Sequence, residues 1–261
     1  ISLGLGLGGG KSATSSGTSG GGGGAFSNDY SISLDGTDDF INCGNDSSLE
    51  PANITLSAWV KVSGSVDTYN YILSKAGSRY GSIHLRYTSS NKFNVHLALA
   101  SNQFINNVTS SSSYTLTDWH HVVFTYDQTN VKLYVDNIEE YSGSETRAID
   151  YAEFDGGGTD FNIGRTAYLY PSPAEGLVDE VAMFNSALTA TQISNIYKGE
   201  ESGGSGGTNG VPGSLATFNP LGWWRMGDND GGTGTTITDQ GSGGNDGTLN
   251  GGPTFSTTVP S

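Results

Sequence analysis

The feature that most constrains this chain is a series of short runs, rich in β-branched and aromatic residues, between residues 26 and 187. Turn-forming residues separate the runs, for example Asp35-Gly36. Many short strands with turn signals between them are typical of an antiparallel sandwich or barrel. The predicted strands cover residues 30–34, 54–62, 71–74, 82–87, 93–98, 120–126, 131–135, 161–164 and 176–184.

One helix signal follows the strands. Thr189 and Gln192 have the spacing of a capping box, in which each side chain satisfies a backbone N–H at the helix start. Ile193 and Ile196 fall on one helix face, and Gly199 can end the helix. We therefore predict a short helix that closes one end of the sandwich.

The N-terminal segment, residues 1–24, is too rich in Gly and Ser to bury a core of its own. Ile1, Leu3, Leu5 and Leu7 alternate with Ser or Gly, a pattern that suits a strand added to the sheet edge of a partner. The alternative is a flexible linker. We interpret the segment as an extended arm that docks on another chain, either a different protein or a copy of this one.

Two further segments follow the predicted helix. Residues 200–213 have the composition of a linker, and residues 214–261 contain an apolar run with Trp223 and Trp224. Fewer than 50 residues with so few apolar side chains do not make a sizeable independent core. We expect both tryptophans to pack against the body of this chain or against a neighbour.

Six segments occur in an order that one known family shares. They read YSISLDGTDDFI at 30–41, TLSAWVK at 55–61, ILSK at 72–75, DWHHVVFTYD at 118–127, VKLYVD at 131–136, and IGR at 163–165 followed by GLVDEVAMF at 176–184. Residues 30–198 thereby resemble the laminin G-like, pentraxin-like jelly rolls of the concanavalin A-like lectin/glucanase superfamily. The resemblance implies an all-β fold, an antiparallel two-sheet jelly-roll sandwich over 25–199 with one short C-terminal helix.

The C-terminal segment resembles the same family out of order. WWRMGD at 223–228, ITD at 237–239 and NDGTL at 245–249 are similar to the strand and loop that normally precede the first motif. The chain therefore resembles a circular permutation, in which 214–261 supplies the missing first strand in its own chain or in a neighbour. The alternative is the truncated start of a second jelly roll. We favour the permutation, because a remnant alone leaves two tryptophans exposed.

Catalysis is not expected. Some relatives in this superfamily are glycoside hydrolases, which need two carboxylates about 5 Å apart or, if inverting, wider. Residues on the same face of a strand are two apart, so adjacent residues point to opposite faces. Asp179 and Glu180 are adjacent, as are Asp38 and Asp39, and no acidic-x-acidic-x-x-acidic strand occurs. We predict a protein that is not an enzyme.

The resemblance implies one cofactor, Ca²⁺, held by carboxylates and backbone carbonyls. The matching acidic positions are Asp35, Asp38 and Asp179, and the family fold implies that the turn at Asp35 lies near the strand of Asp179. The alternative is that these aspartates only make turn and backbone hydrogen bonds. His84 and His96 stand alone in the sequence, without the spacing of a zinc site.

The resemblance also implies carbohydrate binding, in which sugar rings stack on exposed aromatic faces. Tyrosines in or next to predicted loops are the candidates, although such residues are also commonly structural. The candidate sugar-binding residues are Tyr69, Tyr80, Tyr168 and Tyr170, with Tyr71 beside them.

Charge and cysteine content exclude other classes. The formal net charge is −15 with only 11 Lys and Arg, which argues against binding to nucleic acid or to an anionic membrane. No apolar run is long enough to span a membrane. Cys43 is the one cysteine, so an intramolecular disulfide cannot form, and we expect its side chain to be a small buried apolar group.

Gly-, Ser- and Thr-rich jelly rolls that end in a segment similar to GWWRMGD at 222–228 are familiar among tailed bacteriophages. The resemblance implies a virion structural protein, a capsid decoration or tail-fibre subunit displayed on the particle surface. Its partners are then other virion proteins, copies of itself through the arm, and host-surface glycans. The alternative is a carbohydrate-binding adhesin module of a bacterial cell surface.

Overall fold

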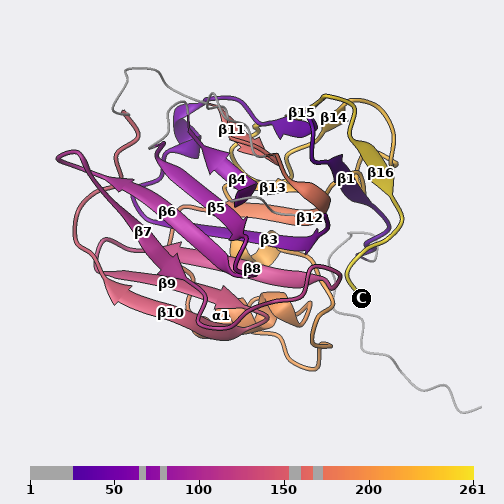
Figure 1. Cartoon of the computed structure of the whole chain (residues 1–261). Coiled ribbons are helices and arrows are strands. Elements are labelled where there is room, and N and C mark those ends of the chain that lie inside the picture. The colour runs from indigo at the N-terminus through magenta and orange to yellow at the C-terminus, as the bar shows by residue number, and fades with distance from the viewer. Residues whose placement is uncertain (1–25, 65–68, 77–80, 153–159, 167–172) are drawn as a thin grey trace, which may run out of the picture.

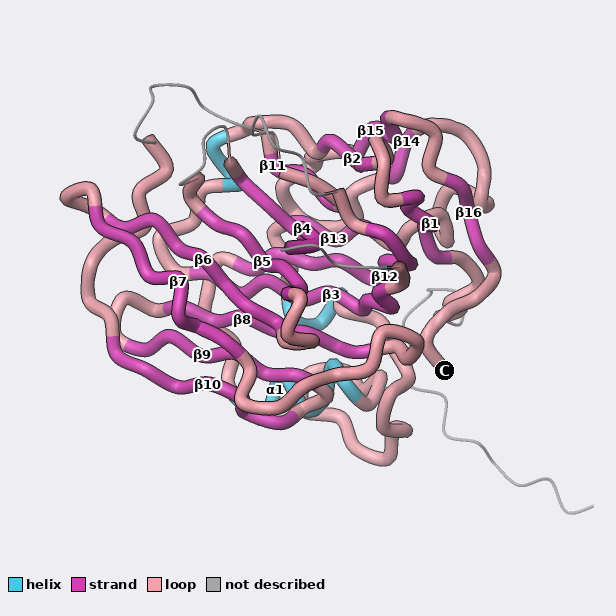
Figure 2. Tube along the Cα trace, in the orientation of Figure 1, coloured by secondary structure: helices cyan, strands magenta, loops and turns pink. Residues whose placement is uncertain are grey.

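The computed structural model of this chain describes residues 26–64, 69–76, 81–152, 160–166 and 173–261. Two antiparallel sheets pack face to face, with one α-helix beside them (Figures 1 and 2). The predicted two-sheet sandwich is confirmed. The arm residues of the N-terminal prediction, Ile1, Leu3, Leu5 and Leu7, lie outside the described part of the chain.

The first sheet is built around the two long strands β3 and β12, which pair with each other. Its order is β10 (Ile138–Ser144), β9 (Asn130–Val135), β8 (His120–Tyr126), β3 (Ile54–Val62), β12 (Glu175–Phe184), β1 (Ser31–Asp35) and β16 (Thr254–Ser256). Strand β13 (Gly222–Trp224) also pairs with β12, at Val181–Met183, beyond the residues of β12 that pair with β1.

The second sheet holds the remaining strands. Its order is β14 (Thr236–Ile237), β15 (Gly247–Asn250), β2 (Phe40–Asn42), β11 (Phe161–Ile163), β4 (Tyr69–Lys75), β5 (Ile83–Thr88), β6 (Phe93–Leu99) and β7 (Gln103–Thr109). The order brings strands from both ends of the chain next to each other, as β15 beside β2 and β16 beside β1.

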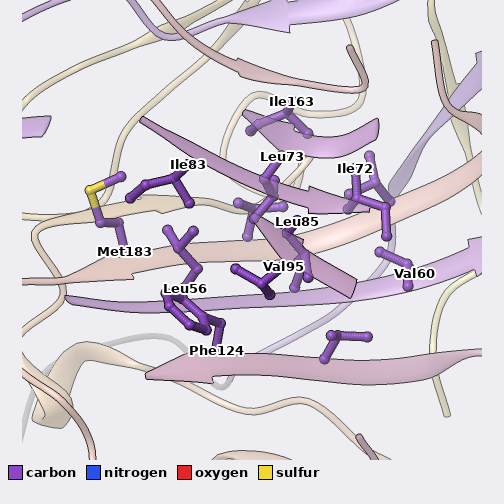
Figure 3. Packing of buried hydrophobic residues seen from close by; sticks show 14 of the residues in the cluster. Leu56, Val60, Ile72, Leu73, Ile83, Leu85, Val95, Phe124, Ile163 and Met183 are labelled. Atoms are coloured by element: carbon purple, nitrogen blue, oxygen red, sulfur yellow. The ribbon is translucent and has the colours of Figure 1, made fainter. Parts of the chain in front are cut away.

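The core lies between the sheets. Side chains of β3 and β8 face those of β4, β5 and β6. Every second residue of β3, β5, β6 and β8 is apolar and buried, and in β4 the adjacent Ile72 and Leu73 both face the core at a β-bulge. Figure 3 shows Leu56 and Phe124 of the first sheet pointing toward Leu85 and Val95 of the second. At roughly 25 cal/mol per Å² of apolar surface removed from water, this continuous cluster is the main stabilising contribution to the fold.

Helix α1 (Ala190–Tyr197) begins with the predicted capping box. Thr189 Oγ1 accepts a hydrogen bond of 3.3 Å from Gln192 N, and Gln192 Oε1 accepts one of 2.9 Å from Thr189 N. Ile193 and Ile196 are buried in a second apolar cluster, together with Phe184 of β12, on the side of the first sheet that faces away from the core. The helix therefore covers a sheet face, where the sequence pattern predicts that it closes one end of the sandwich.

The C-terminal segment contributes strands to both sheets of its own chain. β13 and β16 join the first sheet, and β14 and β15 join the second. Trp224 is fully buried in the core and stacks on Phe161 with ring centroids 5.4 Å apart. Trp223, which points to the other side of β13, lies in the apolar cluster beneath helix α1. Both predicted packing residues thus have partners within this chain.

Short 3-10 helices lie at Ser47–Leu49 and Ala216–Phe218. Among the described residues, no helix has the length and apolar character that a membrane span requires.

Candidate functional site

The outward face of the second sheet carries aromatic and polar side chains. Leu73 of β4 and Leu85 of β5 are paired and point into the core, so Ser74 of β4 and both neighbours of Leu85 on β5 point outward, while Ile72 also faces the core at a β-bulge. The outward pairs include Ser74 with His84 across β4 and β5, and His84 with His96 across β5 and β6. We call the outward side of β4, β5, β6 and β7 the outer face.

An aromatic row crosses the outer face from strand to strand. Tyr69 and Tyr71 of β4 lie 6.0 Å apart between ring centroids, and Tyr71 lies 5.0 Å from His84. His84 lies 5.3 Å from His96, which in turn lies 5.4 Å from Phe104 of β7. Tyr69 and Tyr71 are partly exposed, and Phe104 is 43% exposed, so the two ends of the row face solvent.

Arg86 lies between the aromatic row and a rigid amide. Its guanidinium carbon is 3.7 Å from the ring centroid of Tyr69, and its Nε donates a hydrogen bond of 2.7 Å to Asn94 Oδ1. Asn94 Nδ2 donates to Thr109 Oγ1 at 2.7 Å and to the backbone oxygen of Asn106 at 2.8 Å. These contacts fix both side chains across three neighbouring strands.

Several buried polar atoms along this side of the second sheet have no hydrogen-bond partner among the described residues. They include both ring nitrogens of His84, the hydroxyl of Ser82, Oδ1 of Asn162 and Nε of Arg165. A buried polar group without a partner costs about 1–3 kcal/mol, so these atoms are positions where water or another polar molecule can bind.

Arg86 gives the outer face a positive charge. Burial lowers the pKa of His84 well below its ordinary value of 6.5, and the nearby charges of His96 and Arg86 lower it further. None of the strands β4, β5, β6 and β7 contains Asp or Glu. A neutral His84 can donate one hydrogen bond and accept another.

A first acidic cluster lies in the turn after β1, where the carboxylates of Asp35, Asp38 and Asp39 approach one another within 4.8 Å. Asp35 and Asp38 are exposed. Desolvation raises the pKa of Asp39, and repulsion from Asp35 and Asp38 raises it further. Asp35 Oδ1 and Asp39 Oδ2 accept backbone hydrogen bonds from Thr37 and Asp35, and the other carboxylate oxygens of the cluster are donors of the kind that a hard cation such as Ca²⁺ binds, so these residues fit that ion.

A second acidic cluster joins Asp179, Glu180 and Asp228. All six of their carboxylate oxygens accept hydrogen bonds from protein donors, including Nε1 of Trp223 and the guanidinium of Arg225. The donors leave no oxygen of this cluster uncommitted, so its geometry is that of a structural network joining β12 to the C-terminal segment.

The structure brings Asp35 and Asp38 together but does not bring Asp179 to them. Asp35 pairs with Glu175 across β1 and β12, and Asp179 lies four residues further along β12. At about 3.3 Å per residue, this separation is about 13 Å. The register of the two strands therefore divides the predicted set of metal ligands between two clusters.

Of the predicted sugar-binding tyrosines, Tyr69 lies in the aromatic row together with Tyr71. Tyr80, Tyr168 and Tyr170 lie outside the described residues. Sequence reasoning missed the polar members of the outer face, namely His84, Arg86, Asn94, His96 and the aromatic Phe104. Their signal is the alternation in IHLRY at 83–87 and FNVHL at 93–97, where a polar residue occupies every second position.

Comparison with known proteins gives a family and a fold. The family described as the concanavalin A-like lectin/glucanases superfamily matches residues 35–194. No curated protein matches the sequence. A candidate carbohydrate-binding protein from Bacteroides ovatus ATCC 8483 has a similar structure, with a TM-score of 0.62 and 20% identity over 88% of this chain and 60% of that one. The CBM40 domain of the Ruminococcus gnavus IT-sialidase has a TM-score of 0.50 and 13% identity over 62% and 93%. This chain thus spans 60% of the length of the Bacteroides protein, and at these identities the likeness is one of fold.

Proposed function

Because this chain belongs to the concanavalin A-like lectin/glucanase superfamily, we propose that it is a non-catalytic module that binds glycans on the outer face of its second sheet. The observation that supports this proposal is the aromatic row of Tyr69, Tyr71, His84, His96 and Phe104, which crosses four strands. The carbohydrate-binding description of the Bacteroides protein is compatible with it.

The aromatic row and its polar neighbours suit the apolar C–H faces and the hydroxyl groups of a sugar. The partly exposed rings of Tyr69, Tyr71 and Phe104 can stack against the C–H faces of sugar rings. The Nη groups of Arg86 and the remaining lone pair of Asn94 Oδ1 can hydrogen-bond to hydroxyl groups beside those rings. Because Arg86 and Asn94 are held by each other, little side-chain entropy is lost when a ligand binds.

The absence of acidic residues from the described strands β4, β5, β6 and β7 supports binding without hydrolysis. Glycoside hydrolysis uses two carboxyl groups on either side of the scissile bond. The four strands of the outer face have none. The buried carboxylates of Asp179 and Glu180 are on β12 of the other sheet, where they are engaged by protein donors.

We also propose that Asp35, Asp38 and Asp39 hold one Ca²⁺ at the turn between β1 and β2. The ion would neutralise three carboxylates that otherwise repel one another, and would thereby stabilise the turn. Asp179 takes no part in this site, because its oxygens accept hydrogen bonds from Asn28 and from the backbone of Glu180.

For the biological setting, we propose display on a virion surface, as a capsid decoration or tail-fibre subunit. The resemblance of 222–228 to segments of tailed-phage proteins and the Gly-rich arm at 1–24 support this setting. An antibody against the module is then expected to label purified phage particles in electron micrographs. Labelling confined to bacterial cell envelopes would instead favour an adhesin.

Glycan binding is tested by presenting the protein to an array of oligosaccharides. We expect selective binding, and we expect Phe104→Ala to reduce it by up to about tenfold, since one stacked aromatic contributes roughly 0.5–1.5 kcal/mol. Ile138→Ala is the matched control, because Ile138 is likewise an exposed large apolar residue, 59% exposed, but lies on β10 of the first sheet. Equal losses in both variants, or no binding to any glycan, would contradict the proposal.

A further inference from the structure

The two sheets of this protein differ sharply in charge. None of the eight strands of the second sheet contains Asp or Glu, although the chain carries 26 such residues. The strands of the first sheet contain Asp35, Glu139, Glu140, Glu175, Asp179 and Glu180. In a chain of net charge −15, the described strands of the outer face thus carry the positive charge of Arg86 and no negative side chain.

Arg86 is the cation at the centre of this region. Its Nε is committed to Asn94, but its two Nη groups make no hydrogen bond or ion pair with any described residue. The stack against Tyr69 holds the guanidinium plane in place. An oriented guanidinium with uncommitted donors is matched to a carboxylate, which accepts two parallel N–H bonds.

His84 lies two residues before Arg86 on the same side of β5, about 7 Å away along the strand. The side chain is buried, at 1% exposure, and neither ring nitrogen has a hydrogen-bond partner among the described residues. The described charged groups that act on it are His96 and Arg86, both cationic or neutral. Asp160 lies beside β11 and is already bonded to Asn42 Nδ2 at 2.6 Å.

We infer that the glycan bound by the outer face is an acidic one, whose carboxylate pairs with Arg86 and accepts a hydrogen bond from His84. This inference rests on the proposed glycan-binding function and specifies its ligand class. A neutral sugar satisfies the hydroxyl-binding groups of the face but leaves the charge of Arg86 without a counter-ion. A carboxylated sugar supplies that counter-ion and a partner for a buried imidazole nitrogen.

Matched pairs of oligosaccharides test the ligand class. The probes are oligogalacturonate with its uncharged methyl ester, and a sialylated oligosaccharide with its desialylated form. We expect the carboxylated member of at least one pair to bind about tenfold or more tightly than its uncharged counterpart, since a charge-assisted hydrogen bond is worth about that factor. The preference should decrease as salt is added.

The two proposals fail in different ways in this experiment. Equal binding of both members of each pair, or tighter binding of the uncharged member, overturns the inference but leaves glycan binding intact. Binding to neither member of any pair, and to no other glycan, overturns both.

A variant series assigns the preference to Arg86. Arg86→Gln should lower affinity for the carboxylated probe about tenfold and change affinity for the uncharged one less than about twofold. Arg86→Lys keeps the charge but lacks the planar guanidinium that can form two parallel hydrogen bonds. Its affinity for the carboxylated probe should lie between that of Arg86→Gln and that of the unmodified protein. Lys132→Gln, which removes a cation from β9 of the first sheet, should change neither affinity.

Circular dichroism and melting temperature establish that each variant is folded. If Arg86→Gln does not fold, Arg86→Lys and His84→Gln carry the test, with a selective loss for the carboxylated probe expected from both. Equal losses for both probes would mean that these residues only support the fold, and would overturn the inference.

Discussion

Trp223 Nε1 donates a hydrogen bond of 2.6 Å to Oε2 of Glu180, a carboxylate buried in the middle of β12. Oε1 of the same carboxylate accepts a hydrogen bond of 2.9 Å from Arg225 Nε. Trp223 and Arg225, which lie 43 and 45 positions after Glu180 in the sequence, thus provide hydrogen-bond partners for the buried carboxylate of Glu180. Removing either partner would leave that charge uncompensated, which is costly in a low-dielectric interior.

The C-terminal segment is therefore expected to be part of the cooperative fold. Trp224→Ala should lower the free energy of unfolding by about 3–5 kcal/mol, because a fully buried indole is lost from the core beside Phe161. Urea denaturation measures the change. Thr248→Ala, at an exposed position of β15 in the same segment, is the control and should change stability by less than about 0.5 kcal/mol. Equal and small effects of both substitutions would show that the segment packs elsewhere.

The buried carboxylate predicts a pH-dependent contribution to stability. Burial raises the pKa of Glu180 to about 7 from an ordinary value of 4.5, although Arg225 and Trp223 lower it. The native protein therefore retains a proton that the unfolded chain releases in this window, so this contribution is present at low pH and is lost as pH rises through 7. His121 makes stability increase as pH rises from about 4 to about 6.5, because burial lowers its pKa to about 4 and the unfolded chain binds a proton that the native protein does not.

A glutamine variant separates the contribution of Glu180 to the pH dependence of stability from that of His121. Glu180→Gln resembles the protonated acid at every pH, so its stability relative to the unmodified protein should increase between pH 5 and 8, by up to about 3 kcal/mol. Urea denaturation across that range, with both proteins in the same buffers, measures the difference. A difference that stays constant with pH would contradict a raised pKa at Glu180.

Cys43 should be inert in the folded protein. Its thiol is buried, and desolvation raises its pKa well above the ordinary value of 9.0, so little thiolate forms. An aromatic disulfide reagent is expected to react with Cys43 only in denaturant, at a rate that follows unfolding. Rapid reaction under native conditions would show that β2 and its neighbours open locally.

Calcium is expected to stabilise the turn of Asp35, Asp38 and Asp39. Millimolar Ca²⁺ should raise the melting temperature by a few degrees, since an ion that binds only the folded state shifts unfolding by mass action. Asp38→Asn should remove most of the shift. Asp179→Asn should leave the shift in place while lowering basal stability, because Asp179 accepts its hydrogen bonds from Asn28 and the Glu180 backbone. Loss of the shift in the Asp179 variant alone would restore that residue to the metal site.

Local patterns in the sequence predicted the sandwich and the capped helix, because strand alternation and the Thr189 to Gln192 spacing act over a few residues. The pattern did not predict β7 and β10, which lie at the edges of the two sheets. Edge strands bury fewer side chains, so QFINNVT at 103–109 and IEEYSGS at 138–144 have little apolar alternation.

The candidate site depends on register, which a single sequence does not contain. His84 and His96 are 12 residues apart in the sequence and face each other only because β5 and β6 pair with Ile83 opposite Leu97. Register likewise places Glu175, and not Asp179, opposite Asp35. A shift of one residue would turn each side chain to the other face of its sheet, so the composition of the outer face follows from the pairing.

The most direct test of the central claim is a nuclear magnetic resonance titration of the labelled protein with a glycan that it binds. If the outer face is the binding site, the amide signals of Arg86, Asn94 and Phe104 should shift on titration, while those of Lys132 and Ile138 on the first sheet should not. Shifts concentrated on β9 and β10, with β5 and β6 unchanged, would place the ligand on the opposite sheet and contradict the account.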